Sequence, residues 1–174
     1  MPNIRRARGD DAMKLSVIAE QTFRDTFSRV NKPEDMDLHC RNTFGAAIQA
    51  KEIASPDRVT LLYEQGTRLV GFAQLRWGKV PTCVVADAPG EIQRLYVVGD
   101  AQGKGAAHEI MDACIHEMVR HGSDVVWLGV WARNPRAIAF YRKFAFREVG
   151  EHLFPLGTDR QRDIVMSRPV LIHV

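Results

Sequence analysis

The sequence predicts a mixed α/β fold, in which a central sheet of about seven strands is flanked by about four helices. Three observations predict it. Helical and strand-like segments are mixed along the whole chain. An almost unbroken apolar run, VVWLGVW at 125–131, is typical of a strand that is buried on both faces. The strand, helix and strand over 91–131 form a unit that should be a right-handed parallel crossover.

The N-terminal third is predicted to be one strand followed by two helical regions. Residues 3–8 alternate weakly and predict the strand. Asp10 is a candidate N-cap for a helix that runs to about residue 27. NKPEDM (31–36) starts the second region, because proline suits a first turn and acidic residues favour a helix N-terminus. This region extends to about residue 51, with a break near Gly45.

The middle of the chain predicts a hairpin, a loop, a strand and the clearest helix. Residues 59–64 and 68–77 form the hairpin, and 78–90 form a long loop before a strand at 91–98. In the helix at 105–121, apolar residues recur at three- and four-residue steps and make one stripe.

The C-terminal part predicts a further helix and a final hairpin. Asn134 and Pro135 are a typical N-cap and first helical residue, so a helix should run from there to about residue 144. Strands near 148–154 and 161–168 are joined by a turn at Gly157.

Bulk properties favour one domain over residues 1–174 and exclude several classes of protein. The net charge of +3 is too small to argue for nucleic-acid binding. No window reaches about 18 apolar residues, so no membrane-spanning helix is expected, and the N-terminus does not resemble a signal peptide. The three cysteines form no CxxC or Cys/His cluster, so no metal site is predicted. Reduced cysteines in a cytoplasmic protein are the simplest interpretation.

The stretch QGKGAA (102–107) predicts an anion site. It lies between a strand and a helix, where unpaired backbone amides point outward and glycine allows close approach of a ligand. The alternative is a glycine-rich turn that only joins the two elements. A P-loop is disfavoured, since Lys104 lies between the glycines and no Ser or Thr follows. A dinucleotide fingerprint fails because His108 stands where the third glycine is needed.

The same stretch fits the pattern [Q/R]-x-x-G-x-[G/A], with Gln102, Gly105 and Ala107 in place. With EIQRLYVV before it and VWLGVWARNPRAIAFYRKFAF (126–146) after it, the chain resembles the GCN5-related N-acetyltransferase (GNAT) family. QTFRDTF (21–27), NKPEDM and the closing DRQRDIVMSRPV further resemble a bacterial branch that acetylates spermidine and spermine.

The resemblance implies a GNAT fold, in which the fourth and fifth strands are parallel and splay apart around acetyl-CoA as cosubstrate. Backbone at Tyr96, Val97 and Val98 would pair with the pantetheine arm, and the Val97 amide would polarise the thioester carbonyl. Asn134 would contact the same arm, or serve only as an N-cap. The pyrophosphate would lie on the amides of Gln102, Gly103, Lys104, Gly105, Ala106 and Ala107.

Two residues are the predicted catalytic groups. Tyr141 would supply a proton to the leaving thiolate, and the alternative is a core tyrosine with its hydroxyl at the rim. An alkyl ammonium must lose a proton before it attacks, and Glu91 is the predicted base. The alternative for Glu91 is a solvated residue at a strand end.

The resemblance implies a primary amine as acceptor and, on the branch likeness, a polyamine. Five residues from the first two helical regions are predicted to meet it: Phe23, Asp25, Phe27, Glu34 and Asp35. Ordinary surface acids and core aromatics are the alternative. Other acceptors (a protein N-terminus, an amino acid or an antibiotic) and a non-catalytic acyl-CoA-binding regulator remain alternatives. Relatives are often dimers, so a homodimer is also an alternative.

The sequence departs from the family pattern at two places. Ala145 stands where FYxkxGF has glycine, and a left-handed conformation there would cost roughly 1 kcal/mol. Gly99-Asp100 replaces the proline that is common after the fourth strand.

Overall fold

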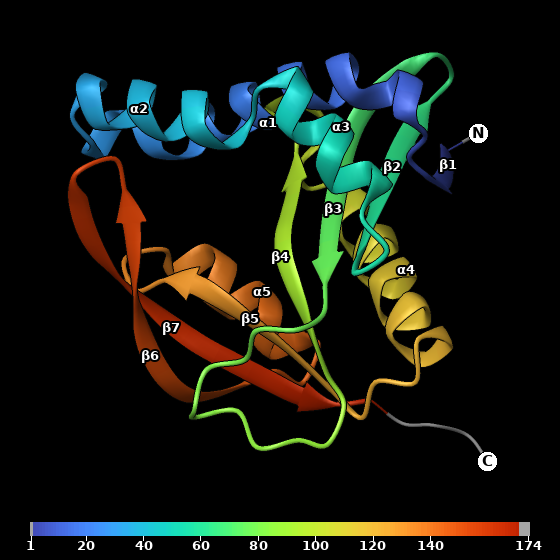
Figure 1. The fold of residues 1–174 in the computed structure, drawn as a ribbon, viewed down its shortest axis with the longest axis vertical. Coiled ribbons are helices and arrows are strands. Elements are labelled where there is room, and N and C mark those ends of the chain that lie inside the picture. Colours follow the sequence, from blue (N-terminus) through green and yellow to red (C-terminus); the bar gives the residue numbers. More distant parts are fainter. Residues whose placement is uncertain (1, 171–174) are drawn as a thin grey trace.

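A computed structural model describes residues 2–170 of the chain. Its centre is one seven-stranded sheet in the order β1-β2-β3-β4-β5-β7-β6 (Figure 1). Neighbouring strands are antiparallel except β4 and β5, which are parallel. The predicted α/β class and the splayed parallel pair are confirmed. The strands are β1 (Pro2–Arg6), β2 (Arg58–Gln65), β3 (Arg68–Arg76), β4 (Pro89–Val97), β5 (Val125–Trp131), β6 (Arg147–Leu156) and β7 (Asp159–Pro169).

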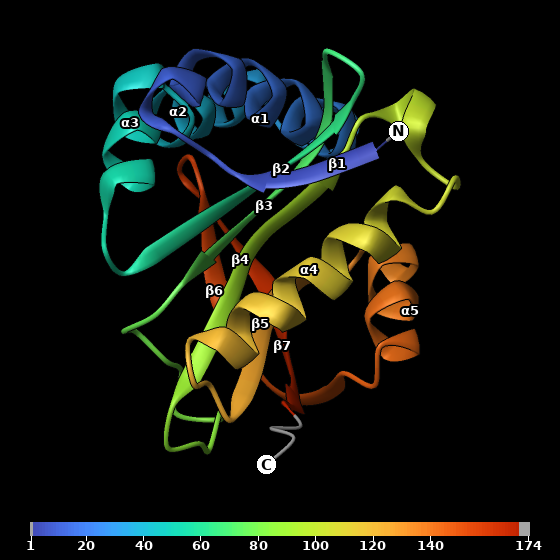
Figure 2. The same cartoon turned by 90° about the vertical axis from the view of Figure 1, so that its right-hand side faces the viewer.

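Five α-helices flank the sheet within residues 2–170, one more than the sequence predicts, because the second helical region divides at Gly45. Helices α1 and α3 pack on one face of β2–β4, and α4 packs on the other (Figure 2). None of the described helices is long and apolar enough to cross a membrane. The helices are α1 (Ala12–Phe27), α2 (Pro33–Thr43), α3 (Ala46–Ala54), α4 (Ala106–Arg120) and α5 (Pro135–Lys143).

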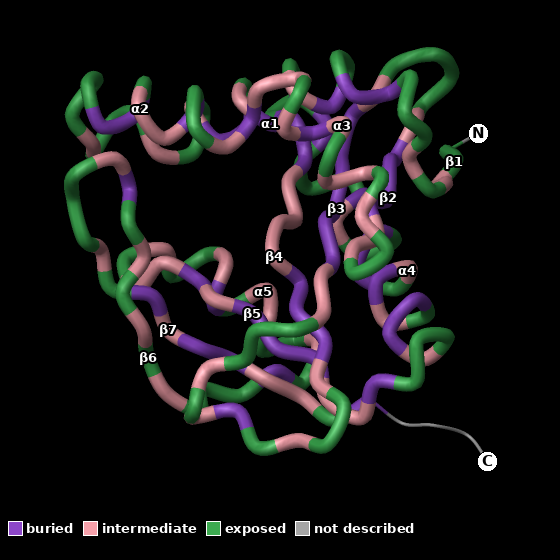
Figure 3. Tube along the Cα trace, viewed as in Figure 1, coloured by how far each residue is buried: buried purple, intermediate pink, exposed green. Residues whose placement is uncertain are grey.

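The apolar stripes predicted for the helices face the sheet, and burial follows them (Figure 3). On α4 the residues Ile110, Met111, Cys114 and Met118 are at most 1% exposed. The predicted cap at Asp10 is wrong by one residue. Asp11 is the N-cap residue of α1, but its side chain makes no capping hydrogen bond, and its carboxylate instead accepts from the Arg8 amide at 2.7 Å and from Arg5 at 2.7 and 2.8 Å.

The splay of β4 from β5 begins after only three paired positions. Pro89, Gly90 and Glu91 pair with Val125, Val126 and Trp127, and beyond them the two strands separate. The loss of this pairing leaves backbone groups on the facing edges without a neighbouring strand. The gap therefore needs a partner that can hydrogen-bond like a strand.

A bulge on β4 sets which side chains face this gap. Three residues of β4 lie opposite β3 residues that are spaced two positions apart. The pairs are Glu91 with Arg76, Arg94 with Gln74, and Tyr96 with Phe72. The three β4 side chains therefore lie on one face of the sheet, although Arg94 comes three residues after Glu91 and Tyr96 comes two residues after Arg94. The bulge adds one residue near Gln93 and shifts the alternation.

Candidate active site

A cavity of about 220 Å³ opens between the splayed strands and the N-terminal helices. Its lining combines aromatic and polar side chains from both the sheet and the helices. The aromatic side chains include Phe23, Phe27, Phe44, Trp131 and Phe154. The polar ones include Arg76, Glu91, Arg94, Tyr96, Asn134, Tyr141, His152 and Asp163.

Tyr141 reaches the cavity from α5, as the catalytic prediction requires. Helix α5 begins at Asn134, whose Oδ1 accepts from the Ala137 amide at 3.2 Å. Asn134 is therefore an N-cap and also lines the cavity, so its two predicted roles are compatible. Burial raises the pKa of the Tyr141 phenol, so the hydroxyl keeps its proton at neutral pH. A phenol in this state is a proton donor.

The end of β4 offers fewer free backbone groups than predicted. The Val98 amide donates to the Val70 carbonyl at 2.9 Å, so it is not available to a ligand. Because backbone groups alternate along a strand, Tyr96 also points its backbone toward β3, while Leu95 and Val97 point theirs into the gap. The Val98 amide is therefore not free to pair with pantetheine as predicted, while the backbone of Leu95 and the Val97 amide face the gap. Tyr96 contributes its side chain to the cavity instead.

The loop before α4 has the form that an anion cradle needs. Gly103 and Gly105 have φ of 74° and 91°, in the left-handed region that favours glycine. A Cβ built at either would meet nothing within 4 Å, so the loop surface is open. No side chain caps α4, and the amides of its first turn lack intrahelical partners. These residues fit a pyrophosphate group.

Gln102 has a different role from the rest of the loop. Its Nε2 donates to the Val97 carbonyl at 3.0 Å, and its Oε1 accepts from Arg136 at 3.3 Å. The side chain therefore ties the loop to the end of β4 and to the start of α5. Its backbone amide already donates to the Gly99 carbonyl at 3.3 Å.

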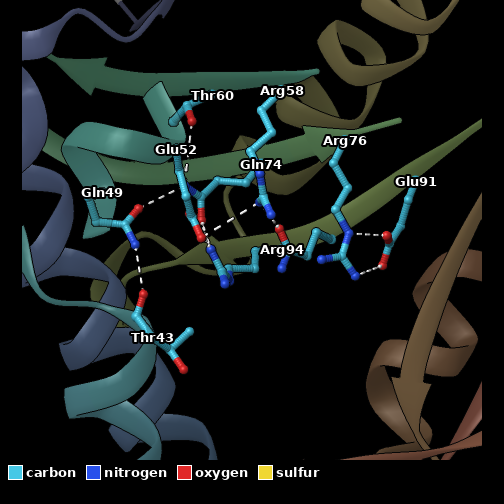
Figure 4. A network of polar contacts seen from close by, with 10 residues as sticks. Thr43, Gln49, Glu52, Arg58, Thr60, Gln74, Arg76, Glu91 and Arg94 are labelled. Carbon is cyan, nitrogen blue, oxygen red and sulfur yellow. Dashed lines mark hydrogen bonds and ion pairs between the residues drawn. The ribbon is translucent and has the colours of Figure 1, made fainter. Parts of the chain in front are cut away.

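Glu91 is buried and paired, not solvated. Its side chain is 7% exposed and forms an ion pair with Arg76 of β3, whose Nη2 donates to Oε1 at 3.3 Å (Figure 4). Both side chains line the cavity. The alternative of a solvated strand-end residue is wrong. The base role stays a prediction, now with a fixed cation beside the carboxylate.

A separate polar network lies beside this pair (Figure 4). Arg94 donates through Nη1 to Glu52 at 2.9 Å and also to the side-chain Oε1 of Gln74. Gln74 donates in turn to Gln49 at 2.9 Å, and Gln49 donates to the Thr43 carbonyl at 2.9 Å. Each fully buried side-chain nitrogen or oxygen of the described chain has a hydrogen-bond partner. The network therefore holds Arg94 firmly at the cavity wall.

The predicted acceptor residues divide into two groups. Phe23 and Phe27 line the cavity, with ring centroids 4.6 Å apart. Asp25 and Glu34 are exposed and lie outside the lining residues. Asp35 is buried and accepts from the amide and hydroxyl of Thr158 at 2.8 and 2.7 Å, so it joins α2 to the turn between β6 and β7.

One pair of cavity residues was missed by the sequence reasoning. His152 of β6 and Asp163 of β7 lie opposite each other, with Nε2 3.7 Å from Oδ2. The signal was present, because a hairpin that turns at Gly157 places these two positions across from one another. Residues 2–170 contain no cluster of His, Cys, Asp and Glu that could hold a metal ion.

Comparisons with known proteins agree with this geometry. The sequence profile of the "Acetyltransferase (GNAT) family" matches residues 19–146. An uncharacterised N-acetyltransferase of Mycobacterium bovis is 30% identical over 161 residues, which cover 92% of this chain and 99% of that protein. The ribosomal protein bS18 alanine N-acetyltransferase of Escherichia coli is 26% identical over 116 residues, which cover 64% of this chain and 78% of that protein.

Among solved structures, the chain is similar to the PaiA N-acetyltransferase of Thermoplasma acidophilum in complex with coenzyme A. The TM-score is 0.76 at 20% identity, over 97% of this chain and 99% of that one. This likeness is evidence for the fold.

Proposed function

The chain belongs to the acetyltransferase (GNAT) family, and from this premise we propose that it transfers acetyl from acetyl-CoA to a primary amine by direct attack in a ternary complex. One observation carries the proposal. The strands β4 and β5 separate beside an open glycine loop at the start of α4, and Tyr141 lies in the same gap. This arrangement provides strand-like backbone, an anion cradle and a proton donor along one path.

The chain's residues would divide the work as follows. The loop amides from Gly103 to Ala107 would hold the pyrophosphate at the positive end of the α4 dipole. The Val97 amide would polarise the carbonyl that is attacked. The Tyr141 phenol would donate its proton to the departing sulfur. Bound acetyl-CoA supplies the activated acetyl group.

A polyamine is the first candidate acceptor, on the likeness to the spermidine and spermine branch. Glu91 and Asp163 provide carboxylates in the cavity, and Phe23 and Phe27 provide apolar walls for an alkyl chain. Asp25 and Glu34 remain candidates only for the approach to the cavity, because they do not line it. A cytoplasmic location and a homodimer are further parts of this proposal, and the three free cysteines fit a reducing compartment.

A second candidate is an amine that also carries a carboxylate, such as an amino acid. Arg94 favours it. Its hydrogen bonds to described residues use only Nη1, and no fully buried nitrogen there lacks a partner, so Nε and Nη2 are not fully buried, and the side chain lines the cavity. The same region also has one positive charge in excess, because three arginines pair with only two glutamates. The arginines are Arg58, Arg76 and Arg94, and the glutamates are Glu52 and Glu91. A carboxylate on the acceptor would balance this charge.

Acetyl-CoA-dependent thiol release with a panel of amines tests the proposal. The panel contains spermidine, spermine, free amino acids and peptides with a free N-terminus. Turnover of at least one amine is expected. Tight binding of acetyl-CoA with no turnover of any amine would support a non-catalytic regulator instead. Turnover of amino acids but not spermidine would remove the polyamine acceptor and favour the second candidate.

The variant Arg94→Gln separates the two acceptor classes. It should raise KM for amino acids by about tenfold or more, because a buried charge-assisted hydrogen bond is lost. It should not raise KM for spermidine. An equal effect on both classes would show that Arg94 only supports the wall of the cavity.

A further inference from the structure

We propose that His152, oriented by Asp163 across the β6–β7 hairpin, is the base that takes the proton from the acceptor ammonium. The proposal rests on the acetyltransferase function proposed above and changes the assignment of the base from Glu91. It concerns two residues on the opposite wall of the cavity from β4.

The geometry directs His152 into the cavity. Along β6 the residues Gly150, His152, Phe154 and Leu156 are partly or fully buried, while those between them are exposed. His152 therefore lies on the inner face of the strand, and it lines the cavity together with Asp163. Its side chain is 35% exposed and that of Asp163 is 12% exposed. The imidazole thus meets both the cavity and solvent, as a group that passes protons outward must.

Gly129 of β5 makes room for this pair. A Cβ at Gly129 would meet His152 Nε2 at 2.8 Å and Asp163 Oδ2 at 3.2 Å, which is too close for a methyl group. The imidazole and the carboxylate therefore lie directly over β5, in the space that a side chain would otherwise fill. Gly129 itself lines the cavity. It lies two residues after Trp127, which is the last β5 residue that pairs with β4. The pair is thus built into the splayed region.

Charged groups on three strands face the imidazole. Asp163 of β7 is the main one, and it raises the pKa of His152 above the ordinary value of 6.5. Burial opposes this rise, Glu91 of β4 adds to it and Arg76 of β3 opposes it. With its pKa raised in this way, the His152 imidazole binds a proton more strongly than an isolated imidazole does.

Glu91 is less suited to take the proton. Its carboxylate is already engaged by Arg76, and a guanidinium keeps its charge at all accessible pH values. Protonation of Glu91 would break a buried ion pair and leave the Arg76 charge without a partner. Protonation of His152 instead creates a charge that Asp163 stabilises. Glu91 is better placed to hold Arg76 away from the incoming ammonium.

Protons, bonds and charge balance in the proposed step. The ammonium gives one proton to the imidazole, and Asp163 stabilises the imidazolium. The neutral amine then forms the C–N bond with the acetyl carbon, the C–S bond breaks, and its electron pair leaves on sulfur. Tyr141 protonates the sulfur, and the second proton of the nitrogen restores Tyr141 through solvent. His152 releases the first proton to solvent, so the net products are an amide, a thiol and one proton.

The test measures the pH dependence of kcat/KM for thiol release, with the fastest amine of the panel. In the wild type, kcat/KM should fall as the pH falls through the raised pKa of His152. The variant His152→Gln should lose about 100-fold or more in kcat/KM near pH 7 and lose the His152 limb of the profile. The variant Asp163→Asn should move this limb to lower pH. Affinity for acetyl-CoA should stay the same in both variants.

Two controls make the result specific. His116→Gln carries the same change at an exposed position of α4, across the sheet from the cavity, and should match the wild type. Titration of the His152 ring by NMR reports its pKa without turnover. A value at or below 6.5 that Asp163→Asn does not lower would overturn the proposed pairing.

Failure of this proposal is distinguishable from failure of the proposed function. Wild-type turnover with an unchanged rate and profile in His152→Gln would overturn the base alone. Absence of turnover on every amine in the wild type would overturn the acetyltransferase function, and the base with it.

Discussion

Ala145 holds a strained backbone conformation at the end of the helix that carries Tyr141. It has φ of 64° and is the only residue other than glycine with positive φ in the described chain. The Phe146 amide donates to the Tyr141 carbonyl at 3.2 Å, and the Ala145 amide donates to the Arg142 carbonyl at 3.0 Å. These two bonds form a Schellman motif, whose left-handed residue is usually glycine. The family pattern also has glycine at this place, so Ala145→Gly should relieve strain.

The expected gain is small and can be worked out. A left-handed conformation costs a residue with a Cβ roughly 1–2 kcal/mol. Glycine loses about 0.5–1 kcal/mol more conformational entropy on folding than alanine. Ala145 is exposed, so the substitution removes no packing. With the middle of each range, the net increase in the free energy of unfolding is about 0.75 kcal/mol, which for a chain of this size raises Tm by about 1.5–3 °C.

Thermal unfolding by calorimetry measures this, and Ala139→Gly is the matched control. Ala139 is exposed in the interior of the same helix, where glycine costs about 1 kcal/mol relative to alanine. The two Ala→Gly changes should therefore shift Tm in opposite directions. If Ala145→Gly lowers Tm as Ala139→Gly does, the Schellman geometry does not strain Ala145 and the reasoning fails.

Three further predictions concern the site and the N-terminal ion pair. Tyr141→Phe should lower kcat by about 100-fold with little change in acetyl-CoA affinity, and an unchanged kcat in the thiol-release assay would remove Tyr141 as the acid. Gly105→Ala should weaken coenzyme A binding, measured by calorimetric titration, because a Cβ is strained at φ of 91°, and native affinity would contradict the proposed cradle. Arg5 holds the pKa of Asp11 at about 2, below its ordinary value of 3.8, so this pair stabilises the fold above about pH 4 and is lost as the pH falls toward 2. Asp11→Asn should lower Tm at pH 7 and flatten the dependence of Tm on pH in that window, and an unchanged slope would refute the assignment.

Elements with strong local signals were predictable from the sequence. The apolar stripe of α4 and the cap at Asn134 depend on residues close together in the chain, so periodicity and capping rules apply directly. The bulge near Gln93 was not predictable, because it is defined by pairing with β3 and has no local signature. Its consequence, that Arg94 shares a face with Glu91, was hidden for the same reason.

The residues that line the cavity could be predicted only where the family pattern or the periodicity of a helix located them. Tyr141, Asn134 and Phe23 were placed in this way, and all three line the cavity. Asp35 looked like an acceptor carboxylate, but it binds Thr158, which is 123 residues away in sequence. Local sequence cannot reveal such a partner. Asp35 is therefore better explained as a bridge between α2 and the last hairpin.

The separation of β4 from β5 connects the fold to its chemistry. Three paired positions hold the strands together, and Gly90 among them leaves room for Met118 of α4 and for Trp77, since a Cβ would clash with Met118 and meet Trp77 at 2.7 Å. Where the pairing ends, each side of the gap carries its own pair of titratable side chains, Glu91 with Arg76 on one side and His152 with Asp163 on the other. If β4 and β5 stayed paired along their whole length, the cavity between them would close, and burying these charges there would cost free energy. The splay instead leaves them around an open cavity, so the feature that creates room for a strand-like cosubstrate also keeps titratable groups accessible to the acceptor amine.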